Sequence, residues 1–526
     1  MLKQTIRSLM IAAFVAALIP AAQAQSWQFV GARAMGMGGA GVATAYGPDA
    51  QYWNPAGLAQ DDDLNETGLL ISAGADLQAA KDVLEGVRDL TDMSKQYNRL
   101  ADAIKNSDMA SAENISTIFK GLNDISKLIG TNAGALVNAN GGLGLKFKNF
   151  AISARAIGTG AVAPVVDTKN ILFNPGGSGL QFSNNTSTPP SAYQSAAQAL
   201  QKAIDDNGLF ASLNTLLGTS YANSTEMVND FVNTAITVGG ASEKDILKAL
   251  NTASSNMGGA SDVIKQAATA TGSYKDNETL AMADAATFGE AALGYGTRVL
   301  PGLKLGANVK VITGYTAQSG VMILSDDKKI KDILDKAYDN KKNSTNLGVD
   351  LGAIVNFSEL LDKEIFLNPQ VGLTAKNING PKFDRPDVDA SLPLAVRKRW
   401  NTNKYELKPQ VRAGASINPI KNITVAADMD VTENDTLLSG IDSRQLALGM
   451  EINLFNRPKF HIPLRVGYNT NLAESDISDF ITAGIGLNMM HFYIELAGAM
   501  STDTTKIDDR TVPNSAAASL SIGFLF

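Results

Sequence analysis

The residue types that most often do chemistry in proteins are scarce in this 526-residue chain. It has no cysteine and only two histidines, His461 and His491. Histidine suits proton transfer near neutral pH, but each of these two lies beside a tight turn between predicted strands, where a polar strand-end role is the simpler interpretation. Without cysteine, thiolate catalysis, Cys-type zinc sites and a disulfide scaffold are excluded. The sequence therefore predicts a protein that is not an enzyme and holds no metal or cofactor.

Two short runs invite a ligand-binding interpretation, and neither has the required spacing. Asp61, Asp62 and Asp63 are adjacent, so their carboxylates cannot all converge on one calcium ion from extended backbone; a solvated linker is expected. The glycine-rich run from Gly31 to Gly41 has no strand before it and no Lys-Ser/Thr after it, as a phosphate-binding loop would need. The net charge of −7 and the pI near 5.1 disfavour nucleic acid as a partner.

The first 24 residues have the features of a secretory signal peptide. Lys3 and Arg7 precede an apolar run from Leu9 to Ile19, and small residues at Ala22 and Ala24 follow. The apolar run is shorter than the roughly 20 residues of a membrane-spanning helix, which disfavours a retained anchor. We expect cleavage after Ala24 and export from the cytoplasm.

From about residue 286 onward, apolar residues recur at every second position, which is the period of a β-strand. Leu303, Leu305 and Ala307, for example, alternate with Lys304 and Gly306. Apolar rows of about 10 residues opposite polar rows are typical of strands with one face toward lipid. The predicted strands are 68–76, 140–148, 150–158, 287–299, 302–316, 344–357, 366–376, 406–418, 423–433, 442–455, 460–469, 479–489, 491–499 and 515–526. The fold class predicted is an all-β, transmembrane, 14-stranded antiparallel outer-membrane β-barrel, residues 67–526.

The connections between these strands alternate in length, as in bacterial barrels with short periplasmic turns and long outside loops. Short turns lie near Asn149, Pro301 and Met490, whereas the connection from Ser358 to Ile365 is of intermediate length. The last strand ends in Phe524 and Phe526, separated by one residue. This ending resembles the carboxy-terminal signal that the outer-membrane barrel assembly machinery recognises, so that machinery is an expected partner.

Two outside loops, 77–139 and 159–286, contain large insertions with the helical period. Ile115, Ile118, Leu122, Ile125 and Ile129 are spaced by three or four residues, and a second run, Val83 to Ile104, is similar. In the second insertion a loop rich in Gly and Pro precedes helices that begin near Ala192. The helices are expected to form a cap over the barrel; docking to a partner protein is the alternative.

Residues 25–66 lie between the signal peptide and the first strand and carry two motifs. One contains Gly38 and Gly39, which allow tight backbone turns, and the other is Asn54, Pro55, Ala56 and Gly57. This segment resembles the amino-terminal hatch of FadL-type proteins, the transporters of long-chain fatty acids and hydrocarbons, which are 14-stranded barrels plugged by such a hatch. The whole layout, with two early helical insertions, is closer to the conjugal transfer TraF-like branch of that superfamily. The resemblance implies a structural role for Asn54, Pro55, Ala56 and Gly57, and Gly38 and Gly39 are expected to let the backbone fold tightly inside the lumen.

The polar face of the strands carries charges of both signs, which the alternation directs into the barrel lumen. They are Arg155, Glu290, Arg298, Lys310, Asp350, Arg412, Asp428, Asp430, Glu451, Arg465 and Glu495, with Lys146. Mixed charges in a confined space are expected to form ion pairs and hatch contacts, because isolated buried charges are costly. A channel for charged solutes is the less favoured interpretation.

These observations lead to two hypotheses of function. The first is a non-enzymatic protein in the outer membrane of a Gram-negative bacterium, in contact with outer-membrane lipid, that resembles TraF-like components of conjugal transfer or envelope assembly and contacts conjugation or envelope proteins through its helical loops. The alternative is a passive channel for long-chain fatty acids or other hydrophobic small molecules. An apolar pocket beside the hatch would favour the channel, and a lumen filled by charged side chains would disfavour it.

Overall fold

The computed structural model describes most of the chain. The described residues are 26–60, 67–80, 100, 102–103, 106–129, 134–172, 180–238, 241–267, 269–273, 277–322, 339–388, 392, 397, 404–438, 441–457, 460–475, 477–507 and 510–525. Several predictions fall outside them: the signal peptide 1–24, the acidic run 61–63, most of the first predicted helix (83–104), the glycine-rich loop 175–179 and Phe526.

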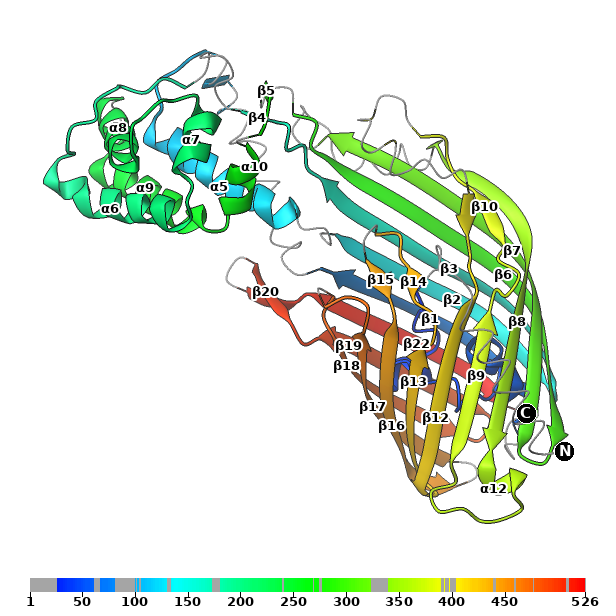
Figure 1. Cartoon of the computed structure of the whole chain (residues 1–526). Helices are drawn as coiled ribbons and strands as arrows, with labels where there is room; N and C mark the ends of the chain where they lie inside the picture. Colours follow the sequence, from blue (N-terminus) through cyan, green and yellow to red (C-terminus); the bar gives the residue numbers. More distant parts are fainter. Residues whose placement is uncertain are drawn as a thin grey trace.

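Fourteen strands form a closed antiparallel barrel, which confirms the predicted fold class (Figure 1). The strands are β1 Thr67–Ala79, β2 Ala135–Phe147, β3 Phe150–Val165, β6 Leu280–Leu300, β7 Leu303–Met322, β8 Lys342–Asn356, β9 Gln370–Lys376, β12 Gln410–Ile420, β13 Ile423–Asp430, β16 Gln445–Arg457, β17 Phe460–Asn471, β18 Phe480–Met489, β19 Phe492–Ser501 and β22 Ser515–Leu525. Strand β1 pairs with both β2 and β22, so the first and last strands close the barrel.

The alternation of apolar and polar side chains explains why this closed sheet is suited to a membrane. Ile71, Leu143, Ile152 and Leu293 are more than half exposed on the outer face, where lipid hydrocarbon replaces water. Between them, small and polar residues face inward. The backbone hydrogen bonds pair with the next strand all the way around, so no polar sheet edge meets the lipid.

Five neighbouring strands are longer than the sequence predicts: β1 and β2 extend three and five residues further toward the long loops, and β3, β6 and β7 extend six or seven. Strands β3, β6 and β7 extend beyond the predicted ends by residues 159–165, 280–286 and 317–322, with the ladder continuing to the Val165–Leu280 and Leu280–Met322 pairs. These extensions are rich in alanine and glycine, so the hydropathy hardly alternates although the hydrogen bonds continue. One side of the barrel wall is therefore taller than the other (Figure 1).

The helices gather at the end of the barrel opposite the short turns (Figure 1). Helix α5 (Ala112–Ile129) comes from the first insertion; α6 (Ser191–Asp206), α7 (Phe210–Leu217), α8 (Ser224–Thr237), α9 (Glu243–Met257) and α10 (Ser261–Ala267) come from the second. Polar caps fix the starts of two helices, since Asn223 accepts from the backbone of Glu226 and Ser242 forms a capping box with Asp245. In the part of the chain that the structure describes, no helix is both long and apolar enough to cross a bilayer.

Short elements complete the fold. The amino-terminal segment, residues 26–60, contains α2 (Ala32–Gly36), α3 (Ala50–Trp53) and the 3-10 helix η1 (Pro55–Ala59). Helix α12 (Phe357–Leu360) lies between β8 and β9. Four two-stranded sheets lie in the connections: β4 (Asn170–Leu172) with β5 (Gly272–Ser273), β10 (Lys382–Asp384) with β11 (Lys404–Glu406), β14 (Asn434–Asp435) with β15 (Asp442–Ser443), and β20 (Thr504–Ile507) with β21 (Arg510–Pro513).

Candidate functional site

The amino-terminal segment lies against the inner faces of strands from all around the barrel. The carboxylate of Asp428 in β13 accepts hydrogen bonds from the backbone of Gly41 and Val42, at 2.7 and 2.8 Å. On another wall, the Thr482 hydroxyl in β18 donates to the Gly36 carbonyl and accepts from the Gly38 amide, both at 3.1 Å. Because strand side chains satisfy its backbone groups, this segment is bound to the wall as part of the folded lumen.

The first predicted motif marks where the segment turns against the wall. Gly38 and Gly39 have φ of 68° and 93°, the left-handed region that favours glycine. A Cβ atom on Gly38 would lie 2.6 to 2.7 Å from the carbonyl oxygens of Tyr468 and Leu448. The backbone of the turn therefore approaches two strands so closely that only glycine fits.

The second motif joins η1 to strands β8 and β9. The side-chain amide of Asn54 donates to the carbonyl oxygens of Val42 and Ala353, at 3.0 and 3.1 Å, and its oxygen caps η1 by accepting from the Ala56 amide. Pro55 occupies the first turn of η1, where its missing N–H needs no partner. A Cβ on Gly57 would lie 2.3 Å from the Ala45 carbonyl oxygen. This geometry is that of a structural motif.

The predicted inward charges meet one another in buried ion pairs. In the largest group, the Arg465 guanidinium lies 2.6 Å from the Glu451 carboxylate and 2.7 Å from that of Glu495, and Arg33 of the amino-terminal segment adds a 3.0 Å contact to Glu451. The other pairs are Arg412 with Asp430 at 2.6 Å, Lys310 with Asp350 at 3.0 Å and with Glu290 at 3.5 Å, and Arg155 with Asp49 at 3.7 Å. The strand-to-strand pairs therefore join strands along the inner wall that are adjacent or, for Arg465 and Glu495, separated by one strand, and the pairs of Arg33 and Asp49 join the amino-terminal segment to that wall.

One predicted inward charge lies elsewhere. Arg298 stands at the turn end of β6, where its side chain is 43% exposed and lies 3.8 Å from Glu359. Side chains still alternate between the two faces of a strand at the rim of a barrel, but no opposite wall encloses the inward-facing ones there. Lys146, by contrast, is buried.

Sequence reasoning missed an aromatic cluster in the lumen. The rings of Trp27 and Trp53 stack with centroids 5.9 Å apart, and Tyr52 packs edge-on against both. The Lys376 ammonium lies 3.1 Å from the centroid of Tyr52 and 3.6 Å from that of Trp27, while the Arg412 guanidinium lies 4.6 Å from the Trp27 ring. Cation–π attraction is strongest when both partners are desolvated. The presence of Trp27, Tyr52 and Trp53 in one short segment is the sequence signal that could have revealed this cluster.

Two small cavities lie in the lumen among the described residues. One of about 30 Å3 is lined by Arg155, Glu290, Lys310, Asp350 and Lys376 among others, and a second of about 20 Å3 is lined by polar residues such as Ser443 and Gln445 and by apolar ones such as Leu136, Ile477 and Phe480. Volumes of this size hold about one or two water molecules. The cavities are therefore too small for a fatty acid or an aromatic hydrocarbon.

Apolar clusters lie in the lumen on the side of the long loops. Phe383 of β10 packs against Phe288 of β6 with ring centroids 5.0 Å apart, and Tyr405 of β11 lies 5.5 Å from Phe288. A second cluster places Leu438 and Ile441 of the β13–β16 connection against the inner faces of β2 and β3. Inward-folded connections thus cover the amino-terminal segment from above.

The two helical insertions share one hydrophobic core. Phe119 and Leu122 of α5 are buried in the same cluster as Leu200 of α6, Phe231 of α8 and Leu250 of α9. Each such side chain contributes about 1.5–3 kcal/mol on burial. The described helices from both loops therefore fold as a single body, which we call the helical unit (α5 with α6–α10).

Polar contacts also organise the surface of the helical unit. The buried carboxylate of Asp230 accepts from the Tyr221 hydroxyl at 2.6 Å and from the backbone of Asn184 and Asn185 at 3.0 Å. Burial, together with the neighbouring Asp230, raises the pKa of Tyr221, which keeps the phenol protonated as the donor. An exposed loop is thereby held on the surface of α8.

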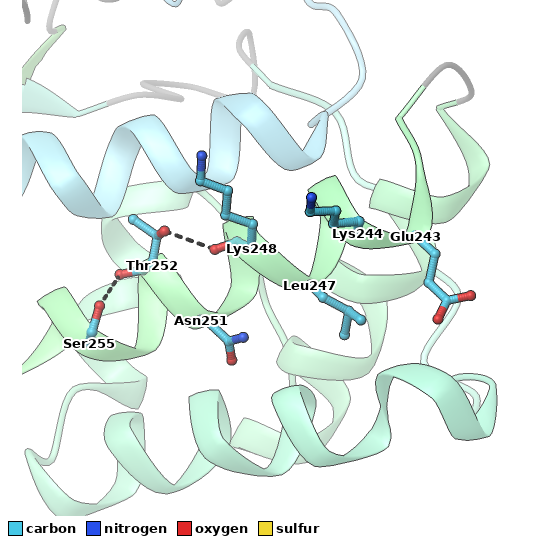
Figure 2. A pocket seen from close by; sticks show the side chains of 7 residues that line it. All are labelled: Glu243, Lys244, Leu247, Lys248, Asn251, Thr252 and Ser255. Atoms are coloured by element: carbon cyan, nitrogen blue, oxygen red, sulfur yellow. Dashed lines mark hydrogen bonds between the residues drawn. The ribbon is translucent and has the colours of Figure 1, made fainter.

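A hollow of about 790 Å3 lies along the solvent-facing side of α9. Figure 2 shows Lys244 and Lys248 on one side of it and Leu247 and Asn251 on the other. The side chains of Lys244, Lys248 and Asn251 are exposed. Its lining combines charged, polar and aliphatic side chains.

The remaining predicted residues lie at the turn end of the barrel. Phe524 is 41% exposed on β22 and packs beside Phe492, with ring centroids 5.5 Å apart. His461 lies in β17 next to Asn488, and His491 lies in the turn between β18 and β19. Among the described residues, no group of three or more His, Asp or Glu side chains is arranged to hold a metal ion.

Comparison with known proteins places the chain in a family. Among solved structures, it is similar to the toluene transporter TbuX of Ralstonia pickettii (10% identity, TM-score 0.41, covering 94% of this chain and 98% of that one). It is also similar to the toluene transporter TodX of Pseudomonas putida and a FadL homologue of Pseudomonas aeruginosa (each 10% identity, TM-score 0.38, covering 96% and 99%). No curated protein matches. A family model matches residues 51–430, well over half of the sequence, and the chain therefore belongs to the family described as F plasmid transfer operon, TraF, protein.

Proposed function

We propose that this protein is a non-enzymatic outer-membrane barrel that serves conjugal transfer or envelope assembly by presenting its helical unit to a partner protein. The observation that carries the proposal is the combination of a filled lumen with one helical body built from two separate loops. A solute channel needs a path, whereas a scaffold needs a rigid support and an exposed surface. Family membership supports the link to transfer.

We further propose the arrangement that this role requires. Residues 1–24 are removed as a signal peptide, residues 25–66 act as the hatch, and the barrel resides in the outer membrane of a Gram-negative bacterium in contact with its lipid. Phe524 and Phe526 form the ending that the barrel assembly machinery reads. The long connections, and with them the helical unit, then lie outside the periplasm.

Removing the helices of the second insertion tests the proposal directly. We expect a variant in which a short Gly-Ser linker replaces residues 191–267 to assemble as a barrel and to reproduce the phenotype of the complete gene deletion, because α5 then loses its core partners. The measurement is transfer or envelope integrity together with heat-modifiable migration of the barrel. A control variant, Lys202→Ala, changes an exposed residue paired with Asp206 and should behave as wild type. Full function in the linker variant would refute the proposal.

The alternative function, a passive channel for hydrophobic small molecules, requires an apolar pocket beside the hatch. Beside the amino-terminal segment, the two cavities found among the described residues are instead of water size, and charged side chains line one of them. We therefore expect organic extraction and mass spectrometry of the detergent-purified protein to show no acyl or aromatic compound in stoichiometric amount. A stoichiometric hydrophobic ligand would favour the channel.

A further inference from the structure

The connection between β8 and β9 is unusually long for its end of the barrel. At that end the turns at 148–149, 301–302, 421–422 and 490–491 each take two residues, whereas this connection takes residues 357–369. In the sequence it already stood out by its intermediate length. We call residues 357–369 the knob; it lies at the opposite end of the barrel from the helical unit (Figure 1).

Hydrogen bonds within the knob and to its neighbours hold it in one conformation. The Asn356 side chain caps α12 by accepting from the Glu359 amide at 3.1 Å, and the Asn368 amide donates to the Ile365 carbonyl at 3.0 Å. The Asn418 amide in β12 donates to the Leu367 carbonyl at 2.7 Å. These contacts fix the position of the connection at the turn end of the barrel.

The backbone of the knob adopts disfavoured conformations. Asp362, Leu367 and Asn368 have φ of 48°, 69° and 42°, in the left-handed region. Aspartate and asparagine tolerate it, but a leucine there is an outlier.

The tip of the knob exposes apolar side chains next to charges. Phe366 is 84% exposed and Leu361 is 51% exposed, and the side chains of Asp362, Lys363 and Glu364 between them are also exposed. Burial in the hydrocarbon core does not explain this composition, because three consecutive charges are costly to place in hydrocarbon. Aromatic residues that face lipid at this end, such as Phe147 and Phe150, stand instead on strand ends.

We propose that the knob is a docking surface for a periplasmic protein, which receives Phe366 and Leu361 in an apolar cleft with a basic rim. An aromatic anchor that enters a pocket, surrounded by polar contacts, is the usual composition of an interface hot spot. The basic rim follows from Asp362 and Glu364, which outnumber Lys363. The short-turn end faces the periplasm in barrels of this class, so this surface is separate from the helical unit and does not depend on its role.

Photo-crosslinking in intact cells tests the proposal with the full chain. A benzophenone-bearing phenylalanine analogue is placed at position 366 and, as the control, at position 147, whose phenylalanine is 59% exposed on a strand end. We expect one discrete protein adduct from position 366 and lipid adducts from position 147. The proposal also requires that Leu361→Ser reduce the adduct at 366 by about tenfold. Lipid adducts alone at position 366, or a protein adduct that Leu361→Ser leaves unchanged, would overturn it.

A phenotype test with matched variants completes the experiment. The double variant Leu361→Ser/Phe366→Ser is expected to assemble normally, as judged by heat-modifiable migration. The activity that disappears when the gene is deleted is expected to be about tenfold or more lower in this variant than in the wild type. The control Phe147→Ser removes an equally apolar residue and should leave that function unchanged. If the two variants behave alike, the knob has no separate partner. If the double variant fails to assemble, the yield of the protein adduct at position 366 in the Leu361→Ser variant tests the proposal in its place.

Discussion

Replacing Arg465 with alanine is expected to lower the free energy of unfolding of the barrel by about 3–5 kcal/mol. The guanidinium lies between Glu451 and Glu495, and its side chain is 1% exposed. Removing the guanidinium leaves the carboxylates of Glu451 and Glu495 close together in a closed lumen. Arg33 then compensates the charge of Glu451 but not that of Glu495. Uncompensated buried charge is one of the few causes of such large losses from a single substitution.

Denaturant unfolding of the barrel in lipid vesicles measures this effect. The matched control is Arg298→Ala, because Arg298 lies 3.8 Å from Glu359 with 43% of its side chain exposed. A solvent-exposed pair of this kind contributes at most about 1 kcal/mol. Equal losses for the two variants would show that the lumen is hydrated and open, contrary to the proposed filling.

Deleting residues 26–60 is expected to convert a closed barrel into a conducting one. The deletion removes the segment that Asp428, Thr482 and Asn54 hold against the wall, so that water enters a lumen lined by Arg412 and Arg465. We expect planar-bilayer recordings of the wild-type protein to show no stable conductance and those of the deletion variant to show ionic currents. The currents should fall as salt concentration is lowered.

The control for this experiment is the linker variant that lacks residues 191–267. It removes more of the chain but leaves the amino-terminal segment and the apolar cluster around Phe383 in place, so it should remain closed. Steady conductance through the wild-type barrel would mean that the segment does not seal the lumen, and the channel hypothesis would then regain support.

Much of the fold follows from local sequence because its cause is local. A strand with one face toward lipid must alternate at every second residue, and the fourteen predicted strands are all present in the barrel. Prediction failed at strand ends such as 280–286, where alanine and glycine hardly alternate in hydropathy, yet the ladder continues. At these positions neighbouring strands, and not side-chain pattern, decide where a strand stops.

The candidate site was only partly predictable for a related reason. Alternation identified Arg412 and Arg465 as inward-facing but could not assign their partners, since Asp430 and Glu451 lie on other strands. The cation–π contact of Lys376 with Trp27 escaped prediction altogether, because it joins a strand to a segment hundreds of residues earlier in the chain. Charge type is a property of the sequence, whereas charge pairing depends on the register between neighbouring strands.

The sequence by itself determined the barrel, its strand number, the direction of its side chains and the presence of two helical insertions, because each depends on periodicity within a single element. Only the tertiary structure decided that the two insertions share one core, that the amino-terminal segment lies in the lumen, and that Phe366 stands exposed on the knob. These features depend on which surfaces meet after closure, and contacts between distant segments leave no periodic signal in one chain.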